Sequence, residues 1–385
     1  MHRSVFITVL LVFGFLSSLP LTGVSAPLVP DPPAIEADGY LLLDYHSGQV
    51  LAERNPDQRM EPASLTKMMA SYIVADQLKK GSIKLDDKVT ISEKAWRMTG
   101  SRMFVEVGSK VAVSELLKGM IVQSGNDATI ALAEYIAGSE KAFVDLMNKE
   151  AKRLGLNDTH FVTATGLPDP EHYSTPRDLA ALGKALIRDF PDQYDLYSMK
   201  SFKYNNIEQH NRNTLLWKND AVDGIKTGHT ESAGYCLVAS AMEHDMRLIS
   251  VVLGTKSKRA RSTESNKLLN YGFRFYETHK LYDADQELTK VHIWKGASQE
   301  LPLGLNEDLY ITIPKGQYKN LDASMSINAE IIAPAQKGQT YGTVNIRLGD
   351  KNYAVRKLIA LSDVGPGTFW RTIVDSIKLA LHSSH

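Results

Sequence analysis

The pattern of hydrophobic and polar residues first distinguishes a long segment, residues 37–284, in which two kinds of periodicity mix. Apolar residues with helical spacing recur at 64–80, 114–123, 126–137, 140–154 and 176–188, and once more after residue 254. Strand-like apolar runs lie at 40–44 and 49–53, on either side of a polar turn, and within 222–254. Helices and strands interleaved in this way predict a mixed α/β domain over 37–284.

The pattern changes from about residue 285. Short runs that alternate apolar and polar residues are separated by Gly, Pro, Asn and Asp, as at 291–294, 309–313 and 343–348. These runs predict a small all-β domain over residues 285–364. Its composition does not decide between a stalk and a docking surface for partners.

Residues 1–26 have the pattern of an export signal. Arg3 precedes an apolar run from Val5 to Leu16, and small residues follow up to Ala26. About a dozen apolar residues suit the core of a signal peptide but are too few to span a bilayer. The proline that comes next leaves the cleavage site open, and a retained N-terminal anchor is the alternative. Residues 27–36 are interpreted as an extended, proline-rich leader.

The last segment, residues 367–385, predicts an amphipathic helix. At about 100° per residue, Trp370, Ile373 and Ile377 share one side with other apolar residues, and only Leu379 falls among the polar ones. A short helix with aromatic residues at its start suits a membrane interface. Docking of its apolar side on the protein's own core is the alternative, although the Pro-Gly break before the helix favours an independent appendage.

Composition and charge narrow the class of protein. The chain has 385 residues, 44 basic and 44 acidic side chains and a single cysteine, Cys236. The absence of net charge argues against nucleic acid as a partner, because phosphate binding needs a basic surplus. One cysteine excludes an intramolecular disulfide and a Cys-rich zinc site, and we expect neither metal nor cofactor. An exported protein without disulfides fits a bacterial periplasm better than a eukaryotic secretory route.

The first motif that carries chemistry is Ser64-Leu65-Thr66-Lys67, at the start of a predicted helix. Residues three apart share a helix face, so the Ser64 hydroxyl and the Lys67 amine can come within hydrogen-bonding reach. A serine attacks only when a nearby group takes its proton, and the helix N-terminus adds N–H groups where an oxyanion develops. Alone the motif is weak, because Ser64 also suits an ordinary helix start.

Two further motifs follow in order: Ser124-Gly125-Asn126 and Lys226-Thr227-Gly228. Read alone, the former predicts a turn and the latter a solvated lysine at a strand edge. Together with the first motif, in this order, they match the signature of penicillin-recognising serine enzymes. The segments 62–69, 123–128 and 223–230 as wholes resemble those of D-alanyl-D-alanine carboxypeptidases, the low-molecular-mass penicillin-binding proteins of the 5 and 6 type.

This resemblance covers nearly everything after the leader and implies both fold and function. The fold is a penicillin-binding-protein/β-lactamase-like α/β domain, an antiparallel sheet with helices, followed by the β domain and the terminal helix. The substrate is a peptidoglycan stem peptide ending in D-Ala-D-Ala, and β-lactam antibiotics are covalent inhibitors. The resemblance also implies a role in cell-wall remodelling and cell shape. With the two ends of the chain, it places the protein peripherally on the periplasmic face of the bacterial inner membrane.

The resemblance implies these catalytic roles, residue by residue. Ser64 is the nucleophile, and Lys67 is the base, which requires a neutral amine. Burial and the charge of Lys226 would both lower the pKa of that amine. Ser124 relays a proton towards the leaving D-alanine, and Asn126 orients the base and the substrate amide. Lys226 supports the Ser124 hydroxyl electrostatically.

Other residues would bind the substrate. The strand with Thr227 and Gly228 pairs with the peptide backbone, and a bare Gly228 lets the substrate approach closely. Thr227 and Arg212 match the positions that hold the terminal carboxylate, with Arg261 a weaker candidate and a surface ion pair the alternative for Arg212. The backbone N–H groups of His229 and of the nucleophile would form the oxyanion hole.

Several residues with reactive side chains are not expected to take part in the chemistry. His229 contributes shape and polarity, since a lysine already serves as the base. Cys236 is a packing residue. Other histidines, such as His160 and His172, are expected to be ordinary surface or satisfied polar residues.

Three rival functions stay open at this stage. A β-lactamase of class A needs a deacylating glutamate before the third motif, and Glu171 lies in that region in an unlike context. A transpeptidase shares the chemistry and is a possible side activity. A non-catalytic wall-binding protein would have no reason to keep all three motifs intact.

Overall fold

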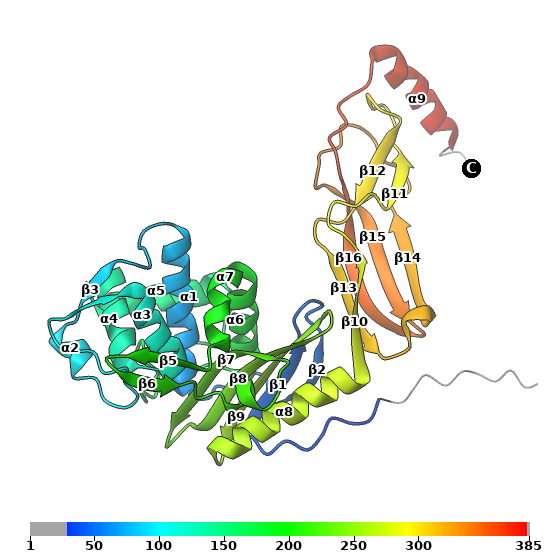
Figure 1. Cartoon of the computed structure of the whole chain (residues 1–385). Helices are drawn as coiled ribbons and strands as arrows, with labels where there is room; N and C mark the ends of the chain where they lie inside the picture. Colours follow the sequence, from blue (N-terminus) through cyan, green and yellow to red (C-terminus); the bar gives the residue numbers. More distant parts are fainter. Residues whose placement is uncertain (1–28, 383–385) are drawn as a thin grey trace, which may run out of the picture.

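The computed structural model describes residues 29–382, so the predicted export signal at 1–26 lies outside the described residues. The chain forms a domain of helices packed on a sheet and a β domain that stands at its end, giving an L-shaped molecule (Figure 1). The predicted α/β domain followed by an all-β domain and a terminal helix is confirmed. The described part of the leader, up to residue 36, has no helix or strand.

The first domain is built on a five-stranded antiparallel sheet in the order β2-β1-β9-β8-β7. Its strands are β1 (Gly39–Asp44), β2 (Val50–Arg54), β7 (Val222–Thr230), β8 (Gly234–Glu243) and β9 (Met246–Thr255). The central strands are apolar along their length because both faces are covered. Helix α8 (Lys258–Phe275) packs on one face and the other helices on the opposite face (Figure 1).

The helical part of this domain has five longer helices and several short elements. The longer ones are α1 (Lys67–Lys79), α3 (Val113–Lys118), α4 (Asn126–Ala137), α5 (Glu140–Arg153) and α6 (Pro176–Asp189). The short helices are α2 (Glu93–Trp96) and α7 (Pro191–Tyr194). Two small antiparallel sheets pair β3 (Lys88–Thr90) with β4 (Lys110–Ala112), which flank α2 in the chain, and β5 (Ser201–Tyr204) with β6 (Ile207–His210). The predicted helix at 114–123 changes at Gly119 into a π-turn that ends at Gln123.

The β domain begins earlier than the sequence pattern predicts. Strand β10 (Tyr276–Tyr282) pairs with β13 (Leu309–Pro314), so it belongs to the β domain although the pattern places the boundary after residue 284. The second sheet runs β11-β12-β16-β15-β14. Its strands are β11 (Thr289–His292), β12 (Glu300–Gly304), β14 (Leu321–Ile327), β15 (Thr340–Leu348) and β16 (Lys351–Ala360). The β10-β13 pair and this five-stranded sheet enclose one apolar core.

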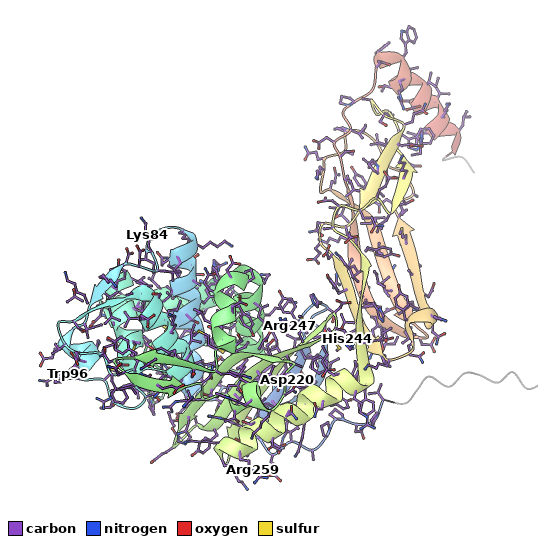
Figure 2. The ribbon with its side chains drawn as sticks, in the orientation of Figure 1. Lys84, Trp96, Asp220, His244, Arg247 and Arg259 are labelled. Carbon is purple, nitrogen blue, oxygen red and sulfur yellow. The ribbon has the colours of Figure 1, made fainter. Side chains whose placement is uncertain are left out.

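A buried carboxylate joins the two domains. Asp44, at the end of β1, is fully buried and accepts hydrogen bonds from the Ser47 hydroxyl (2.8 Å) and from the Thr278 hydroxyl of β10 (2.8 Å). Arg247 lies beside this joint, near the foot of the β domain (Figure 2), and forms an ion pair with Asp223 at 2.6 Å. A buried carboxylate with several hydrogen-bond donors fixes geometry, so the joint sets the orientation of the first domain relative to the β domain.

Helix α9 (Phe369–His382) lies at the far end of the β domain (Figure 1). Its polar side faces the domain: Asp375 is 7 % exposed and accepts a hydrogen bond from the backbone N–H of Lys295 at 2.7 Å. Leu379, which the helical pattern leaves among polar residues, is buried on this side as well. The apolar side of α9 is therefore turned outwards. Among the described residues, no helix has the length and apolarity needed to cross a membrane.

Candidate active site

Ser64 lies in a 3₁₀ turn, Ala63–Thr66, that leads directly into α1. This turn packs against the edge strand β7. A Cβ at Gly228 would lie 2.8 Å from the carbonyl oxygen of Pro62 and 3.2 Å from the Ala63 side chain. The sequence analysis assigns Gly228 to close approach of the substrate. These contacts give the missing side chain a second reason: it makes room for the turn that carries Ser64.

The Lys67 amine is held by three oxygen atoms. Nζ lies 3.0 Å from the Ser64 Oγ, and it donates hydrogen bonds to the Asn126 Oδ1 and to the backbone carbonyl of Thr165, both at 2.8 Å. A neutral amine has two N–H groups and one lone pair. With both N–H groups directed at Asn126 and Thr165, the lone pair is left to face the Ser64 hydroxyl.

The charge state of Lys67 follows from its surroundings. Burial, with a smaller contribution from the Arg212 charge, lowers the pKa of the amine from 10.5 to about 7, and Asp127 opposes the shift. The expected coupling of Lys67 with Lys226 is present as a shift of the Lys226 pKa, and Arg212 is a further charge that acts on Lys67. A base whose pKa is near neutral can accept a proton at physiological pH.

Ser124 and Asn126 come from the turn between the π-turn and α4. Ser124 adopts a left-handed conformation (φ 65°), and its buried hydroxyl has no hydrogen-bond partner among the described residues. The Asn126 side chain donates to the Thr99 carbonyl at 2.7 Å while its oxygen accepts from the lysine. The amide is thereby fixed, and the Ser124 hydroxyl is left free for a substrate.

Lys226 lies on β7 and is 3 % exposed. Burial lowers the pKa of its amine well below the ordinary value, and the charges of Lys67, Arg212 and Arg261 act in the same direction. Its Nζ donates to the carbonyl of Thr227 at 3.3 Å. The three sequence motifs therefore meet around one cavity.

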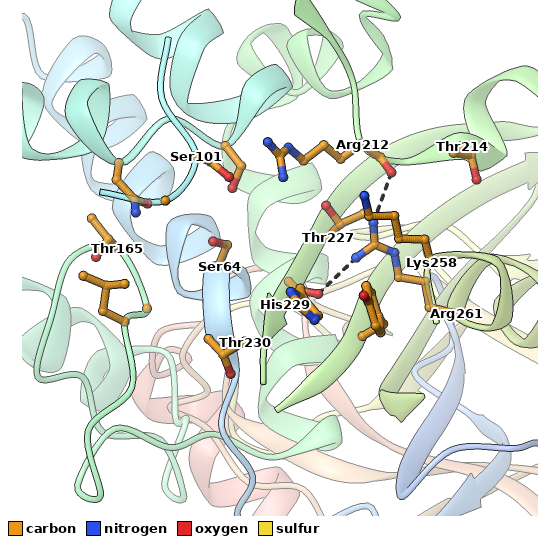
Figure 3. A pocket seen from close by; sticks show the side chains of 17 residues that line it. Ser64, Ser101, Thr165, Arg212, Thr214, Thr227, His229, Thr230, Lys258 and Arg261 are labelled. Carbon is orange, nitrogen blue, oxygen red and sulfur yellow. Dashed lines mark hydrogen bonds between the residues drawn. The ribbon is translucent and has the colours of Figure 1, made fainter. Parts of the chain in front are cut away.

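That cavity has a volume of about 660 Å³. Ser64 on one wall faces Thr227, Arg212 and His229 on the other (Figure 3). Arg212, Lys258 and Arg261 line it, and no described carboxylate does. A cationic cavity beside a free strand edge suits an extended peptide that ends in a carboxylate. Within the described residues, the outer edge of β7 carries no partner strand.

Arg261 has a different place from the one the sequence analysis considers. Its guanidinium is 4 % exposed and donates to the backbone carbonyls of Gly228 (3.0 Å) and Arg212 (3.3 Å), as the dashed lines in Figure 3 mark. Both its terminal nitrogens are thus engaged by the chain. Arg261 braces the strand and the loop that present Thr227 and Arg212.

His229 stacks on Tyr235, with ring centroids 3.9 Å apart. Burial and the positive charges of Arg261 and Lys258 lower the pKa of its imidazole. Both effects favour the neutral imidazole, and the backbone N–H of His229 lies on the strand that borders the cavity. Glu171 is exposed and does not line the cavity, so a deacylating glutamate is not provided by that residue. Cys236 is fully buried, as the sequence analysis predicts for a packing residue.

Several groups at the site lie outside the three sequence motifs and could not be found from them. Thr165 contributes a backbone carbonyl, which leaves no mark in the residue types. Lys258 reaches the cavity from the start of α8, well beyond the third motif along the chain, and Tyr235 reaches it from β8, the strand that pairs with β7. Asp127, adjacent to the second motif, is buried and accepts hydrogen bonds from the backbone N–H groups of Met103 and Phe104. In the sequence, only its position directly after Asn126 indicates that Asp127 belongs to the site.

Comparison with known proteins gives two family matches. Residues 26–257 match the family described as D-alanyl-D-alanine carboxypeptidase, and residues 276–366 match the C-terminal domain of penicillin-binding protein 5. The second match begins at the first residue of β10, where the structure begins the β domain.

Individual relatives are similar over almost the whole chain. The D-alanyl-D-alanine carboxypeptidase DacA of Escherichia coli K12 is 48 % identical over 364 residues, which cover 92 % of this chain and 90 % of that protein. DacC of the same organism is 46 % identical, with 96 % and 94 % covered. The crystal structure of penicillin-binding protein 5 from Haemophilus influenzae superimposes with a TM-score of 0.85 at 46 % identity, covering 87 % of this chain and 99 % of that one.

Proposed function

The chain belongs to the D-alanyl-D-alanine carboxypeptidase family and is a serine-type peptidase with that activity; from this premise we propose that it cleaves the terminal D-alanine from peptidoglycan stem peptides through an acyl-enzyme on Ser64. The observation that carries this proposal is the Lys67 amine, 3.0 Å from the Ser64 hydroxyl and held by two other acceptors. The two bonds direct its lone pair at the proton that must leave.

Substrate binding comes first in the proposed sequence of steps. The peptide adds to the free edge of β7, as an extended segment can. Its terminal carboxylate is held by Arg212 and the Thr227 hydroxyl, with Lys258 adding positive charge. The carbonyl between the two D-alanines then lies over Ser64, and its oxygen faces the N–H groups of Ser64 and His229.

Acylation and deacylation use the same groups. Lys67 removes the Ser64 proton as the oxygen attacks the carbonyl carbon, and the N–H groups stabilise the oxyanion. The proton passes through the Ser124 hydroxyl to the departing amine of D-alanine, with the buried Lys226 beside it. Water then attacks the ester carbon while the neutral Lys67 takes a proton from it. As the bond between the acyl carbon and the Ser64 oxygen breaks, Lys67 passes that proton to the oxygen, which restores the Ser64 hydroxyl and the neutral amine.

The test of this proposal is release of D-alanine from diacetyl-Lys-D-Ala-D-Ala. We expect wild-type protein to release it and Ser64→Ala to release none, because the only attacking oxygen is removed. Rapid penicillin hydrolysis without D-alanine release would instead identify a β-lactamase. Transfer of the acyl group to an added amine would reveal transpeptidation as a side activity.

We also propose that α9 holds the protein on the periplasmic face of the inner membrane after export. This proposal is supported by the outward apolar side of the helix, where Phe369 and Trp370 are each 74 % exposed and Ile377 is 58 % exposed. The docked polar side, held through Asp375, keeps that apolar side turned away from the domain. Aromatic residues at one end of such a helix favour the membrane interface.

A double variant, Trp370→Glu with Ile377→Glu, tests the membrane proposal. We expect the wild-type protein to pellet with vesicles of phosphatidylethanolamine and phosphatidylglycerol and the variant to stay in solution, with unchanged activity on the soluble peptide. Met325→Glu, at another exposed apolar residue of the same domain, is the control and should still pellet. Equal pelleting of the double variant and the wild type would refute the anchor.

A further inference from the structure

The Thr165 carbonyl that orients Lys67 belongs to a turn, residues 162–166, that is held by hydrogen bonds between its backbone and side chains. Thr165 is 1 % exposed and lies between Thr163 and Gly166, whose backbone N–H donates to the Thr163 hydroxyl at 3.0 Å. The neighbouring Ala164 N–H donates to the Glu140 carboxylate at 3.1 Å. The position of this turn relative to α1 decides where the Thr165 oxygen meets the amine.

One side chain ties the turn to the nucleophile segment. The imidazole of His172 is 2 % exposed, and its Nδ1 accepts hydrogen bonds from the backbone N–H groups of Val162 (3.0 Å) and Thr163 (3.2 Å). Its Nε2 lies 2.7 Å from the hydroxyl of Thr66. Because Nδ1 faces two donors, it must be the unprotonated nitrogen, so Nε2 carries the proton and donates to Thr66.

Thr66 stands directly before Lys67 and is fully buried. The turn packs closely against it: a Cβ at Gly166 would lie 2.8 Å from the Thr66 hydroxyl. His172 therefore holds, on one side, the turn that supplies the Thr165 carbonyl and, on the other, the residue next to the amine. A single ring sets the separation of the two segments that meet at Lys67.

We infer that His172 is a positioning residue for the reaction, which aims the Lys67 lone pair at Ser64 by clamping the 162–166 turn to Thr66. The inference rests on the proposed role of Lys67 as the base. Without the clamp, the Thr165 oxygen moves off the N–H group, the amine rotates, and water enters beside it. Displacements of about 1 Å at such a site cost on the order of 100-fold in rate.

The charge state of the ring agrees with this arrangement. Burial lowers the pKa of His172 to about 4, so the imidazole is neutral wherever Lys67 can act. The ring makes a T-shaped contact with the Phe161 ring, with centroids 5.7 Å apart. His160 lies on the same loop and provides a matched control, because its ring bonds to the Glu171 carbonyl and not to Thr66 or to the 162–166 turn.

The experiment measures the second-order rate of acylation by benzylpenicillin against pH, together with thermal unfolding, for full-length variants. We expect His172→Ala to lower the rate about 10- to 100-fold. In this variant the rise of the acylation rate with pH should move to higher pH, because water readmitted to the site raises the pKa of Lys67. His172→Gln, whose amide can accept and donate, should recover part of the rate, and His160→Ala should match the wild type.

Thr66→Val tests the clamp from its other end and keeps the volume of the side chain. We expect it to slow acylation about 10-fold with the same direction of pH shift. A folded His172→Ala protein that acylates within about twofold of wild type, with an unmoved pH profile, would overturn the inference. If His172→Ala fails to fold, wild-type acylation by Thr66→Val would overturn it equally.

Lys67→Arg, measured beside these variants, separates the two proposals. If Lys67→Arg is inactive while the clamp variants behave as wild type, only the role of His172 fails. If Lys67→Arg acylates normally, the proposed base itself is wrong.

Discussion

Lys67→Arg is expected to slow acylation of Ser64 by about 10³-fold or more while the protein stays folded. Arginine keeps the positive charge and the hydrogen-bond donors, but its guanidinium does not lose a proton in proteins, so it offers no lone pair to the Ser64 hydroxyl. Removal of a general base costs typically 10²- to 10⁴-fold. The measurement is the rate of labelling by a fluorescent penicillin.

The pH dependence of the wild-type rate belongs to the same prediction. Below a pH of about 7 the Lys67 amine is protonated and cannot accept the serine proton, so the rate should rise with pH through the pKa of about 7. The residual rate of Lys67→Arg should lack this limb. Lys79→Arg, an exposed lysine on the same helix, is the matched control and should retain both rate and limb. A limb that persists unchanged in Lys67→Arg would assign the titration to another group.

The second large effect is expected at Gly166, where a substitution should lower both the free energy of unfolding and the acylation rate. Gly166 has a φ of +81°, and a Cβ there would overlap the backbone carbonyl of Ala63, the residue before the nucleophile. Left-handed backbone costs an L-residue about 1–2 kcal/mol, and overpacking costs about 1–3 kcal/mol more. Gly166→Ala should therefore destabilise the protein by roughly 2–5 kcal/mol in the free energy of unfolding.

The same substitution displaces the turn that carries Ser64. Because Ala63 is linked directly to the nucleophile, we expect acylation to fall by about 100-fold or more. Gly155→Ala is a matched control, since Gly155 has a similar φ of +74° and nothing within 4 Å of a Cβ. It should lose about 1–2 kcal/mol and keep wild-type acylation. Equal stability losses in the two variants, with acylation intact in both, would show that the turn is not packed on the nucleophile as described.

Much of the fold could be predicted because local patterns coincide with local structure. The long helices and the hairpin around residues 46–48 follow from apolar spacing and turn residues. The start of the β domain could not be predicted in this way. Strand β10 continues directly from α8, and only its pairing with β13 shows that it belongs to the β domain. The π-turn after α3 likewise depends on packing and not on residue types.

At the site, the sequence could propose side chains in motifs but not the groups that the fold brings to them. Thr165 acts through its carbonyl, and Arg261 acts through bonds to carbonyls of strand β7 and of the loop that carries Arg212. Gly228 illustrates the opposite limit: its need for a missing side chain was predicted, but the neighbour that requires it was not. His172 looked ordinary, since nothing in the sequence places it against Thr66.

The central claim is that Ser64 forms the covalent intermediate with Lys67 as its base. The most direct measurement is the intact mass of the protein after brief exposure to benzylpenicillin, followed by proteolysis to locate the adduct. The account predicts one added penicilloyl group per chain, on the peptide that contains Ser64, and none on Ser64→Ala. An adduct on another residue, or equal labelling of Ser64→Ala, would contradict it.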